Sequence, residues 1–409
     1  MCYLIPVNNR IIIAIHYLEL GGAEISLIGL LQSLDYSKYD VDLFVYSHRG
    51  ELMEFIPKEV NLLPEIKEYA QIERPLKDVI KDGYWKIAFA RLKAKMQFRR
   101  YVRRHHPKDR SAIFQYVSSA VSPYLPSLDH LDEYDLAISF LTPHNIVLEK
   151  VKAKKKAAWI HTDYSRIDVN TDLELPVWSG FDHIVSISQE VNKAFVSRFP
   201  SLEPKIIEIE PILSAKFVRE RAELIPPQEI ALEMDRKEGE TILLSVGRFC
   251  EAKNYDNVPD ICKRIIESGC PVKWYLIGYG GDEPLIRRKI AEAGMEDIVI
   301  ILGKKTNPYP YIKACDIYVQ PSRYEGKSVT VREAQILCKP VVITDYPTAR
   351  SQVKYGIDGV IVPLDNEGCA AGIVSLIKDV EKQRSLIEFE KDNDFGNEAE
   401  SCKIDSLLN

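Results

Sequence analysis

Two glutamates in the last third of the chain have a type and spacing that suit the binding of hydroxyl groups. Glu325 and Glu333 are separated by seven residues in the stretch SRYEGKSVTVREA (322–334), where an apolar run leads through a turn into a helix. Ser328 can cap this helix, whose first amide groups then favour a phosphate. A carboxylate accepts hydrogen bonds from two hydroxyl groups of a sugar. The stretch therefore predicts a nucleotide-sugar site, with one acid for the sugar and the other for the ribose.

The same residues have a structural alternative. Thr330–Glu333 (TVRE) matches the S/T-x-x-E capping box, in which the glutamate only satisfies a backbone amide at the start of the helix. Taken alone, the sequence leaves this alternative open beside the binding function.

Two cations follow another apolar run. Arg248 ends the run in SVGRFCEAKN, and Lys253 follows it five residues later on a predicted loop. A guanidinium and an ammonium group at the carboxyl end of one strand can neutralise a diphosphate. Surface arginines and lysines are common, so this pair indicates a phosphate site only together with the acids.

Two further turns carry candidate residues in the first half of the chain. Gly21 and Gly22 stand in HYLELGGAEIS before a predicted helix, where glycine lets the backbone approach a ligand closely. His161 follows the apolar end of AAWIHTDYSR, beside Asp163. A histidine in such a place is either a satisfied structural residue or part of a site, and its position at the end of a strand favours the site.

The elements that must position these residues alternate along the chain. Short apolar runs of four to eight residues alternate with helical segments, first from Ile11 and again from Thr241. This alternation predicts two parallel sheets covered by helices on both faces, the doubly wound α/β class. Ligands of such sheets bind beyond the carboxyl ends of the strands, so all the candidate turns lie at the expected edges, which can face one another across a cleft.

Length and composition agree with a globular protein of two domains. The chain has 409 residues, of which 46% are hydrophobic, and no apolar run approaches the length of a membrane span. The first residues lack the pattern of a signal peptide. Eight scattered cysteines without a C-x-x-C pair predict neither a disulfide framework nor a zinc site, and they fit a reducing cytosol.

Together the motifs resemble retaining glycosyltransferases of the GT-B fold, specifically glycosyltransferase family 4 (glycosyl transferases group 1). The resemblance rests on Glu325 and Glu333 in E-x(7)-E, Arg248 and Lys253 in VGRxxxxK, GGAE, and the histidine of WIHTD, in the family's order along nearly the whole chain. It implies a Rossmann-like acceptor domain over 1–212 and a donor domain over 213–385. A C-terminal helix at about 386–409 would pack back on the first domain.

The resemblance also implies a role for each position. Arg248 and Lys253 would hold the donor diphosphate, Glu333 the ribose and Glu325 the hexose, with His161 beside the transferred sugar. The retaining transfer would proceed on one face of the sugar through an oxocarbenium-like state, without a metal or another cofactor. The donor would also be contacted by Gly21, Gly22, Gly303, Lys304, Lys327, Ser328 and Val329.

The chain departs from the family pattern at two places. Lys327 stands where the family usually has an apolar residue, and EPILS (210–214) replaces the usual Asn-Pro pattern. Both departures bear on the identity of the sugar more than on the reaction.

One basic segment predicts where the acceptor is found. Trp85–Arg110 contains ten Lys or Arg residues and one acid, with apolar residues among the cations. It is either a solvated helix or an interfacial helix that docks on anionic lipids through residues such as Arg99, Arg100, Arg103 and Arg104. No nucleic-acid-binding motif accompanies it. We favour the interfacial helix, and with it a lipid-linked or membrane-proximal acceptor and a cytoplasmic protein on the inner face of the cell membrane.

The sequence thus predicts a metal-independent retaining hexosyltransferase that uses a nucleotide sugar, most simply a UDP-hexose, in polysaccharide or glycolipid biosynthesis. Two alternatives remain. One is a non-catalytic GT-B subunit that binds a glycan or a partner enzyme, although such subunits tend to lose donor-site residues that are all present here. The other is a nucleotide-sugar epimerase on the same fold.

Overall fold

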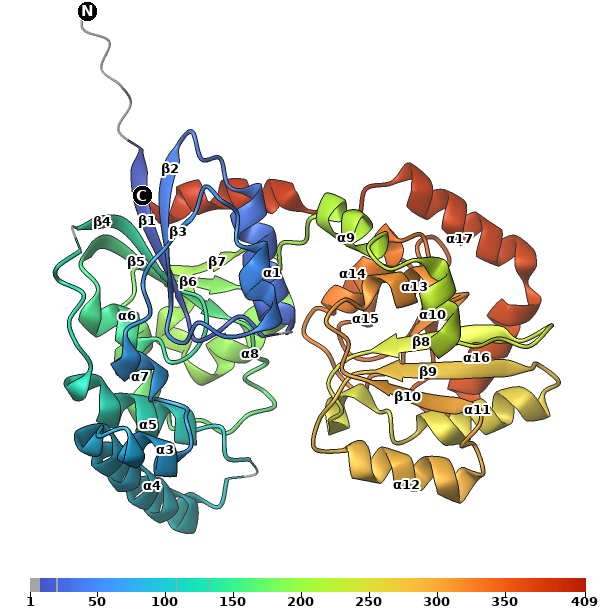
Figure 1. Cartoon of the computed structure of the whole chain (residues 1–409), viewed down its shortest axis with the longest axis horizontal. Coiled ribbons are helices and arrows are strands. Elements are labelled where there is room, and N and C mark those ends of the chain that lie inside the picture. The colour runs from blue at the N-terminus through green and yellow to red at the C-terminus, as the bar shows by residue number, and fades with distance from the viewer. Residues whose placement is uncertain (1–7, 20, 108, 132) are drawn as a thin grey trace, which may run out of the picture. The chain divides into compact units, whose positions relative to one another are not determined.

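The computed structural model describes residues 8–19, 21–107, 109–131 and 133–409. The chain divides into two compact units, one of Met1–Ile212 with Glu398–Asn409 and the other of Leu213–Asn397. Each unit contains one parallel sheet with helices on both faces (Figure 1). Cys2 and Lys108, which took part in the predictions above, lie outside the described residues, and the other seven cysteines are free.

The sheet of the first unit has seven strands in the order β3-β2-β1-β4-β5-β6-β7, all parallel. Its central strands are runs of buried apolar residues, as in β1, where Ile11–Ile15 are at most 1% exposed. The order reverses between β1 and β4, which makes this pair the switch point of the sheet. The strands are β1 (Asn9–Ile15), β2 (Tyr39–Val45), β3 (Asn61–Leu62), β4 (Tyr134–Ser139), β5 (Ala153–Ile160), β6 (His183–Ser186) and β7 (Ile206–Glu208).

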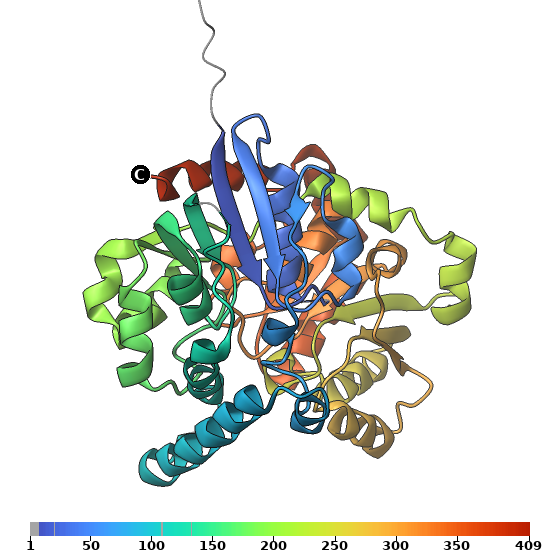
Figure 2. The same ribbon diagram turned by 60° about the vertical axis from the view of Figure 1, so that its left-hand side comes forward.

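The helices of the first unit cover its sheet, except for a group that extends beyond the carboxyl ends of β1 and β2. This group comprises α3, α4 and α5, and α4 is its longest member (Figures 1 and 2). The helices are α1 (Gly22–Ser33), α2 (Lys67–Ala70), α3 (Leu76–Lys81), α4 (Trp85–His105), α5 (Ile113–Val121), α6 (Asn145–Lys150), α7 (Thr171–Ser179) and α8 (Gln189–Arg198), with 3-10 turns η1 (Glu51–Phe55), η2 (Ser122–Tyr124), η3 (Pro200–Lys205) and η5 (Glu398–Leu407).

The sheet of the second unit has six parallel strands in the order β10-β9-β8-β11-β12-β13. Here the order reverses between β8 and β11, so the switch point lies between these two strands. The strands are β8 (Thr241–Val246), β9 (Val272–Ile277), β10 (Val299–Gly303), β11 (Ile317–Gln320), β12 (Val341–Thr344) and β13 (Val360–Val362).

The helices of the second unit bury apolar faces against that sheet, with Ile261 and Ile265 of α11 and Ile373 of α16 fully buried in one core. The helices are α9 (Ala215–Ala222), α10 (Pro227–Glu233), α11 (Val258–Glu267), α12 (Glu283–Ala293), α13 (Tyr309–Ala314), α14 (Val329–Ile336), α15 (Ala349–Gln352), α16 (Asn366–Lys378) and α17 (Val380–Asp392), with the 3-10 turn η4 (Glu251–Lys253).

The predicted fold class of two doubly wound α/β domains is confirmed. The C-terminal return differs in extent from the predicted 386–409, because only Glu398–Asn409 is grouped with the first unit. Leu386 of α17 is fully buried in the core of the second unit, which keeps this helix there. Ile404 and Leu407 of η5 are at most 1% exposed in the first unit.

No helix in the described part of the chain is both long enough and apolar enough to span a membrane.

Candidate functional site

A partly buried ion pair lies at the switch point of the second sheet. Lys253 ends η4, which follows β8, and Glu325 lies in the loop between β11 and α14. The Nζ atom of Lys253 is 2.5 Å from Oε1 of Glu325, and the side chains are 18% and 12% exposed. The structure therefore brings together two residues that the sequence places 72 positions apart.

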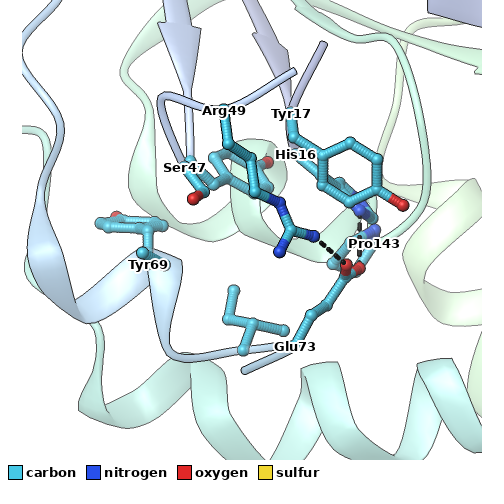
Figure 3. A pocket seen from close by; sticks show the side chains of 10 residues that line it. His16, Tyr17, Ser47, Arg49, Tyr69, Glu73 and Pro143 are labelled. Atoms are coloured by element: carbon cyan, nitrogen blue, oxygen red, sulfur yellow. Dashed lines mark ion pairs between the residues drawn. The ribbon is translucent and has the colours of Figure 1, made fainter. Parts of the chain in front are cut away.

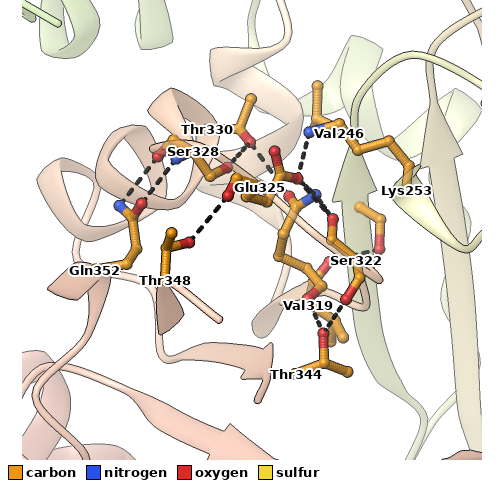
Figure 4. A network of polar contacts seen from close by, with 12 residues as sticks. Val246, Lys253, Val319, Ser322, Glu325, Ser328, Thr330, Thr344, Thr348 and Gln352 are labelled. Atoms are coloured by element: carbon orange, nitrogen blue, oxygen red, sulfur yellow. Dashed lines mark hydrogen bonds and ion pairs between the residues drawn. The ribbon is translucent and has the colours of Figure 1, made fainter. Parts of the chain in front are cut away.

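Glu325 is held by more than this ion pair. The hydroxyl of Ser322 donates to Oε1 of Glu325 at 2.6 Å, and Nε2 of Gln320 donates to the same atom at 3.1 Å (Figure 4). The hydroxyl of Thr348 donates to the main-chain carbonyl of Glu325 at 3.0 Å. The carboxylate is thus oriented before any ligand arrives. An ammonium group has three N–H donors, so the ion pair leaves two on Lys253 for other acceptors.

The N-terminus of α14 lies next to this cluster. Ser328 occupies the N-cap position, but within the described part of the chain its side chain makes no capping hydrogen bond. Its hydroxyl contacts that of Thr330 at 3.1 Å, and its backbone N–H donates to Gln352 at 2.7 Å. The first amides of α14 therefore lack a side-chain cap, which leaves the helix terminus suited to an anion. Val329 is the first residue of this helix, and Lys327 lies half-buried in the loop before it.

Glu333 lies inside α14 and is fully buried. The hydroxyl of Tyr309 donates to its Oε1 at 2.9 Å, while Oε2 has no hydrogen-bond partner among the described residues. Burial raises the pKa of Glu333 to about 7, and the hydrogen bond from Tyr309 opposes part of that rise. The capping-box alternative is wrong, because Thr330 lies within the helix and its hydroxyl donates to Gln320 at 3.2 Å.

The loop that carries Arg248 is packed against a glycine turn. A Cβ atom on Gly278 would lie 1.9 Å from the carbonyl oxygen of Gly247, so only glycine fits there. The N–H of Phe249 donates to the carbonyl of Tyr279 at 2.8 Å. Arg248 is exposed and makes no hydrogen bond or ion pair with any described residue, which leaves its guanidinium free for an anion.

The remaining predicted donor residues of the second unit lie at the end of β10. Gly303 is the last residue of that strand and has a φ of 72°, in the region that favours glycine. The ammonium group of Lys304 lies over the ring of Tyr279, 5.1 Å from its centroid.

In the first unit, Gly21 lies at the N-cap of α1, and Gly22 is the first residue of that helix. A Cβ atom on Gly21 would come within 2.2 Å of a carboxylate oxygen of Glu24, so this close approach involves the helix's own acid. The motif alone predicts only a close approach to a ligand and does not indicate this contact.

His161 follows β5 directly, and its ring packs 4.8 Å from that of Phe140. Burial lowers the pKa of His161 to about 3, although a hydrogen bond to the backbone of Phe140 opposes the shift. The imidazole is therefore neutral at physiological pH. Its Nε2 atom is buried and has no partner among the described residues.

Sequence reasoning missed two further histidines at the same edge of the first sheet. His16 follows β1 and His144 follows β4, as His161 follows β5. Burial, together with the nearby His16 and His161, lowers the pKa of His144 to about 3. The signal was available, because each histidine stands just beyond an apolar run, as in IIIAIH and DLAISFLTPH.

His16 also lines a small pocket of about 20 Å³ (Figure 3). Its Nδ1 is 2.8 Å from Oε1 of Glu73, and a guanidinium nitrogen of Arg49 is 3.8 Å from the other oxygen of that carboxylate. The ring of His16 stacks on that of Tyr46 with centroids 5.6 Å apart. The pocket has room for one water molecule or hydroxyl group.

The predicted membrane-binding arginines all lie on α4. Arg99, Arg100, Arg103 and Arg104 are exposed, and they make no ion pair with any described residue. Among the residues that the structure describes, no group of three or more histidine, cysteine or acidic side chains could hold a metal ion.

Residues 228–393, which belong to the second unit, match the family model "Glycosyl transferases group 1". The chain is 24% identical over 224 residues to the amylovoran biosynthesis glycosyltransferase AmsK of Erwinia amylovora, covering 53% of this chain and 49% of AmsK. It is 29% identical over 140 residues to an N-acetylgalactosaminyltransferase of Campylobacter jejuni that acts on a diphospho-undecaprenol-linked sugar, covering 34% of this chain and 37% of that protein. The matches span about half or less of these relatives.

Solved glycosyltransferase structures of the GT-B type share the fold over nearly the full length. Alr3699/HepE of Anabaena, solved in complex with UDP-glucose, has a TM-score of 0.67 at 16% identity, covering 98% of this chain and 99% of that one. A point mutant of TarM from Staphylococcus aureus, solved in complex with UDP, has a TM-score of 0.67 at 12% identity, covering 98% and 100%. The family model matches the second unit, and the solved structures show that the chain shares their fold.

Proposed function

We propose that the chain is a retaining glycosyltransferase that moves a hexose from a nucleotide sugar, most simply a UDP-hexose, to a lipid-linked or membrane-proximal glycan or glycolipid. The observation that carries the proposal is the cluster at the switch point of the second sheet. There Lys253, Glu325 and the open N-terminus of α14 combine positive charge with an oriented carboxylate. The match of this unit to glycosyl transferases group 1 supports the same activity.

The positive groups of this site fit a leaving nucleoside diphosphate. Arg248 has no protein partner among the described residues, Lys253 keeps two unused N–H donors, and the α14 amides add the positive end of a helix. Preorganised positive groups stabilise the charge that develops as the diphosphate leaves. The proposed reaction therefore includes no divalent metal.

The two glutamates fit hydroxyl groups better than proton transfer. Glu325 is fixed by Lys253, Ser322 and Gln320, and a carboxylate held in this way accepts hydrogen bonds at its remaining lone pairs. Glu333 keeps one buried oxygen without a described partner, which suits a ribose hydroxyl. We assign the proton of the acceptor hydroxyl to the departing phosphate oxygen, so that neither glutamate forms a bond to the sugar.

Binding of UDP and of uridine to the full chain, measured by calorimetry, tests the diphosphate site. Arg248→Gln should weaken UDP binding about 10-fold, the equivalent of one charge-assisted contact, and leave uridine binding unchanged. Arg288→Gln, which changes an exposed arginine of α12, is the matched control. Equal binding of UDP by the wild type and Arg248→Gln would remove Arg248 from the donor site.

We also propose that the protein works at the cytoplasmic face of a membrane and docks there through α4. This helix carries eight Lys or Arg residues and no Asp or Glu. Near an anionic surface, each cation contributes about 1 kcal/mol to binding. Co-sedimentation with anionic but not with neutral vesicles is the expected result, and equal recovery with both kinds of vesicle would contradict the docking.

A further inference from the structure

Helix α4 has a buried stripe and an exposed apolar stripe on opposite faces. Ile87, Arg91, Ala94 and Phe98 are buried against the first unit. Two positions earlier, the stripe of Trp85, Phe89, Leu92 and Met96 repeats the same spacing of four, three and four residues, with exposed fractions of 64%, 65%, 43% and 52%. A helix turns by about 100° per residue, so an offset of two residues places the second stripe on the outer face. Large apolar side chains gathered on an outer face mark an interaction surface.

A groove runs beside this exposed stripe, between α4, α5 and α7. It has a volume of about 770 Å³, within the range of small-molecule sites. One wall carries the cations of α4. The opposite wall carries Tyr116 of α5, Tyr124 of η2 and Asn170, the N-cap of α7. The amide of Asn170 donates to the hydroxyl of Tyr116 at 2.8 Å, which fixes this polar wall. The cationic wall is formed by Lys93, Arg100 and Arg104, and His105 lines the groove beside them.

The cations of the groove lack protein counter-ions. Lys93, Arg100 and Arg104 make no ion pair with any described residue, and α4 itself contains no acid. Solvated helix faces usually alternate charges so that acids lie three or four residues from cations. Asp172 is the single acid that lines the groove among the described residues. The groove thus presents a net positive wall opposite aromatic and amide groups, a combination that recognises a phosphoryl group attached to a sugar.

We propose that this groove binds the phosphoryl group and first sugar of the lipid-linked acceptor, while the neighbouring apolar stripe enters the bilayer surface. The inference rests on the proposed glycosyl transfer for its choice of ligand. Phe89 belongs to both features, because it is part of the stripe and also lines the groove. We place the phosphate of such a lipid beside Arg100 and Arg104, which follow Phe89 along the same helix and line the same groove.

The positions of the arginines on α4 allow an experiment to distinguish a specific phosphoryl site from general electrostatic attraction to a membrane. Arg100 and Arg104 line the groove, whereas Arg99 and Arg103 do not, although both pairs have the same residue type, spacing and exposure. An anionic bilayer attracts both pairs through charge alone. A phosphoryl site in the groove involves only Arg100 and Arg104.

Binding of a short polyprenyl phosphate and of the corresponding neutral alcohol, both in neutral detergent micelles, tests the proposal on the full chain. Tryptophan fluorescence can follow the titration, because Trp85 is 64% exposed while the other three tryptophans are buried, and native mass spectrometry is the second readout. The wild type should bind the phosphate about 10-fold more tightly than the alcohol. Arg100→Gln/Arg104→Gln should lose this preference, and Arg99→Gln/Arg103→Gln should keep it. Inorganic phosphate as a competitor distinguishes a lipid phosphate from a free anion.

Two results would overturn the groove site: a preference unchanged in Arg100→Gln/Arg104→Gln, or one lost equally in both double variants. The second result would reduce α4 to a basic membrane surface. All four arginines are exposed and lack described partners, so both variants should keep the wild-type melting temperature. Lipid binding is measured without a nucleotide sugar. A failure of the proposed glycosyl transfer can therefore be distinguished from a failure of the groove to bind the lipid phosphate.

Discussion

At the residue scale, the Lys253–Glu325 pair shows how one contact can serve both folding and binding. Both side chains are mostly buried, and Oε1 of Glu325 accepts from three donors. Removing one partner of a buried pair leaves an uncompensated charge, whereas removing both does not.

A double-mutant cycle should therefore be strongly non-additive. Lys253→Met and Glu325→Gln should each lower the free energy of unfolding by about 3 kcal/mol, and the double variant should lose much less than their sum. Urea unfolding of the four proteins provides the measurement. Additive losses would mean that the two side chains do not form a coupled pair.

Glu333 predicts a pH dependence of stability. Its pKa is about 7 in the folded protein and 4.5 in the reference state, so the folded state binds more protons between these values. Stability from this group is therefore lost as pH rises from about 4.5 to 7, by about 3 kcal/mol. Glu333→Gln should flatten this part of the profile relative to the wild type. Parallel profiles for the two proteins would show that Glu333 titrates normally.

The sequence was sufficient to find the acids and cations of the second unit, because each stands in a short motif beyond an apolar run. It could not show that Lys253 pairs with Glu325, since that contact depends on which strands are neighbours in the sheet. The ion pair of His16 could not be predicted for a related reason. Its partner Glu73 lies in a region without an apolar run to mark it, so only the tertiary fold reveals the pair.

At the element scale, the strands of four or more residues could be predicted and the three shortest strands, all at sheet edges, could not. Apolar runs indicated β1, β2, β4, β5, β6 and β8–β12, each of four or more residues. The peripheral strands β3, β7 and β13 have only two or three residues. They are therefore too short to be recognised as apolar runs of four to eight residues. The order of the strands defines both switch points. It depends on contacts between residues that are far apart in the sequence, so the local spacing of apolar residues does not predict it.

The basic segment was predicted to extend to Arg110, but helix α4 ends at His105. His106 adopts a left-handed conformation with a φ of 48°, and Pro107 follows it. A left-handed residue with a following proline is a common end of a helix.

The outer stripe of α4 makes a prediction about membranes. Trp85→Gln/Leu92→Gln should reduce co-sedimentation with anionic vesicles several-fold, because neither side chain lines the groove and both are exposed. Leu224→Gln/Leu232→Gln, in which two exposed leucines of the second unit are changed, is the matched control. Equal losses in the two double variants would show that α4 has no special role at the bilayer.

At the scale of the whole molecule, the chain returns to its first unit after building the second. Within the first unit, the hydroxyl of Ser401 donates to the carbonyl of Ser33 at 2.9 Å, and the hydroxyl of Tyr39 donates to the carboxylate of Asp405. The family resemblance placed this return at about 386–409. The buried side chains of α17 and η5 decide which unit each segment joins.

The return segment should stabilise the first unit. Ile404→Ala should lower the free energy of unfolding by about 2–5 kcal/mol, as expected for a fully buried aliphatic side chain. Calorimetric scans of the full chain measure the change, with the exposed neighbour Cys402→Ala as control. A melting profile unchanged by Ile404→Ala would mean that η5 contributes little to the fold.

The central claim is that the cluster around Lys253 and Glu325 transfers a sugar. It is tested most directly by nucleoside diphosphate release from UDP-, GDP- and ADP-sugars in EDTA, with a membrane lipid extract as acceptor. The comparison includes Lys253→Met, Glu325→Gln and, as a matched control, Lys273→Met, which removes a lysine–aspartate pair outside this cluster. We predict release from one donor by the wild type and Lys273→Met, with at least about a 100-fold loss in the other two variants. No release and no binding of any nucleotide by the wild type would contradict the account and favour a non-catalytic subunit.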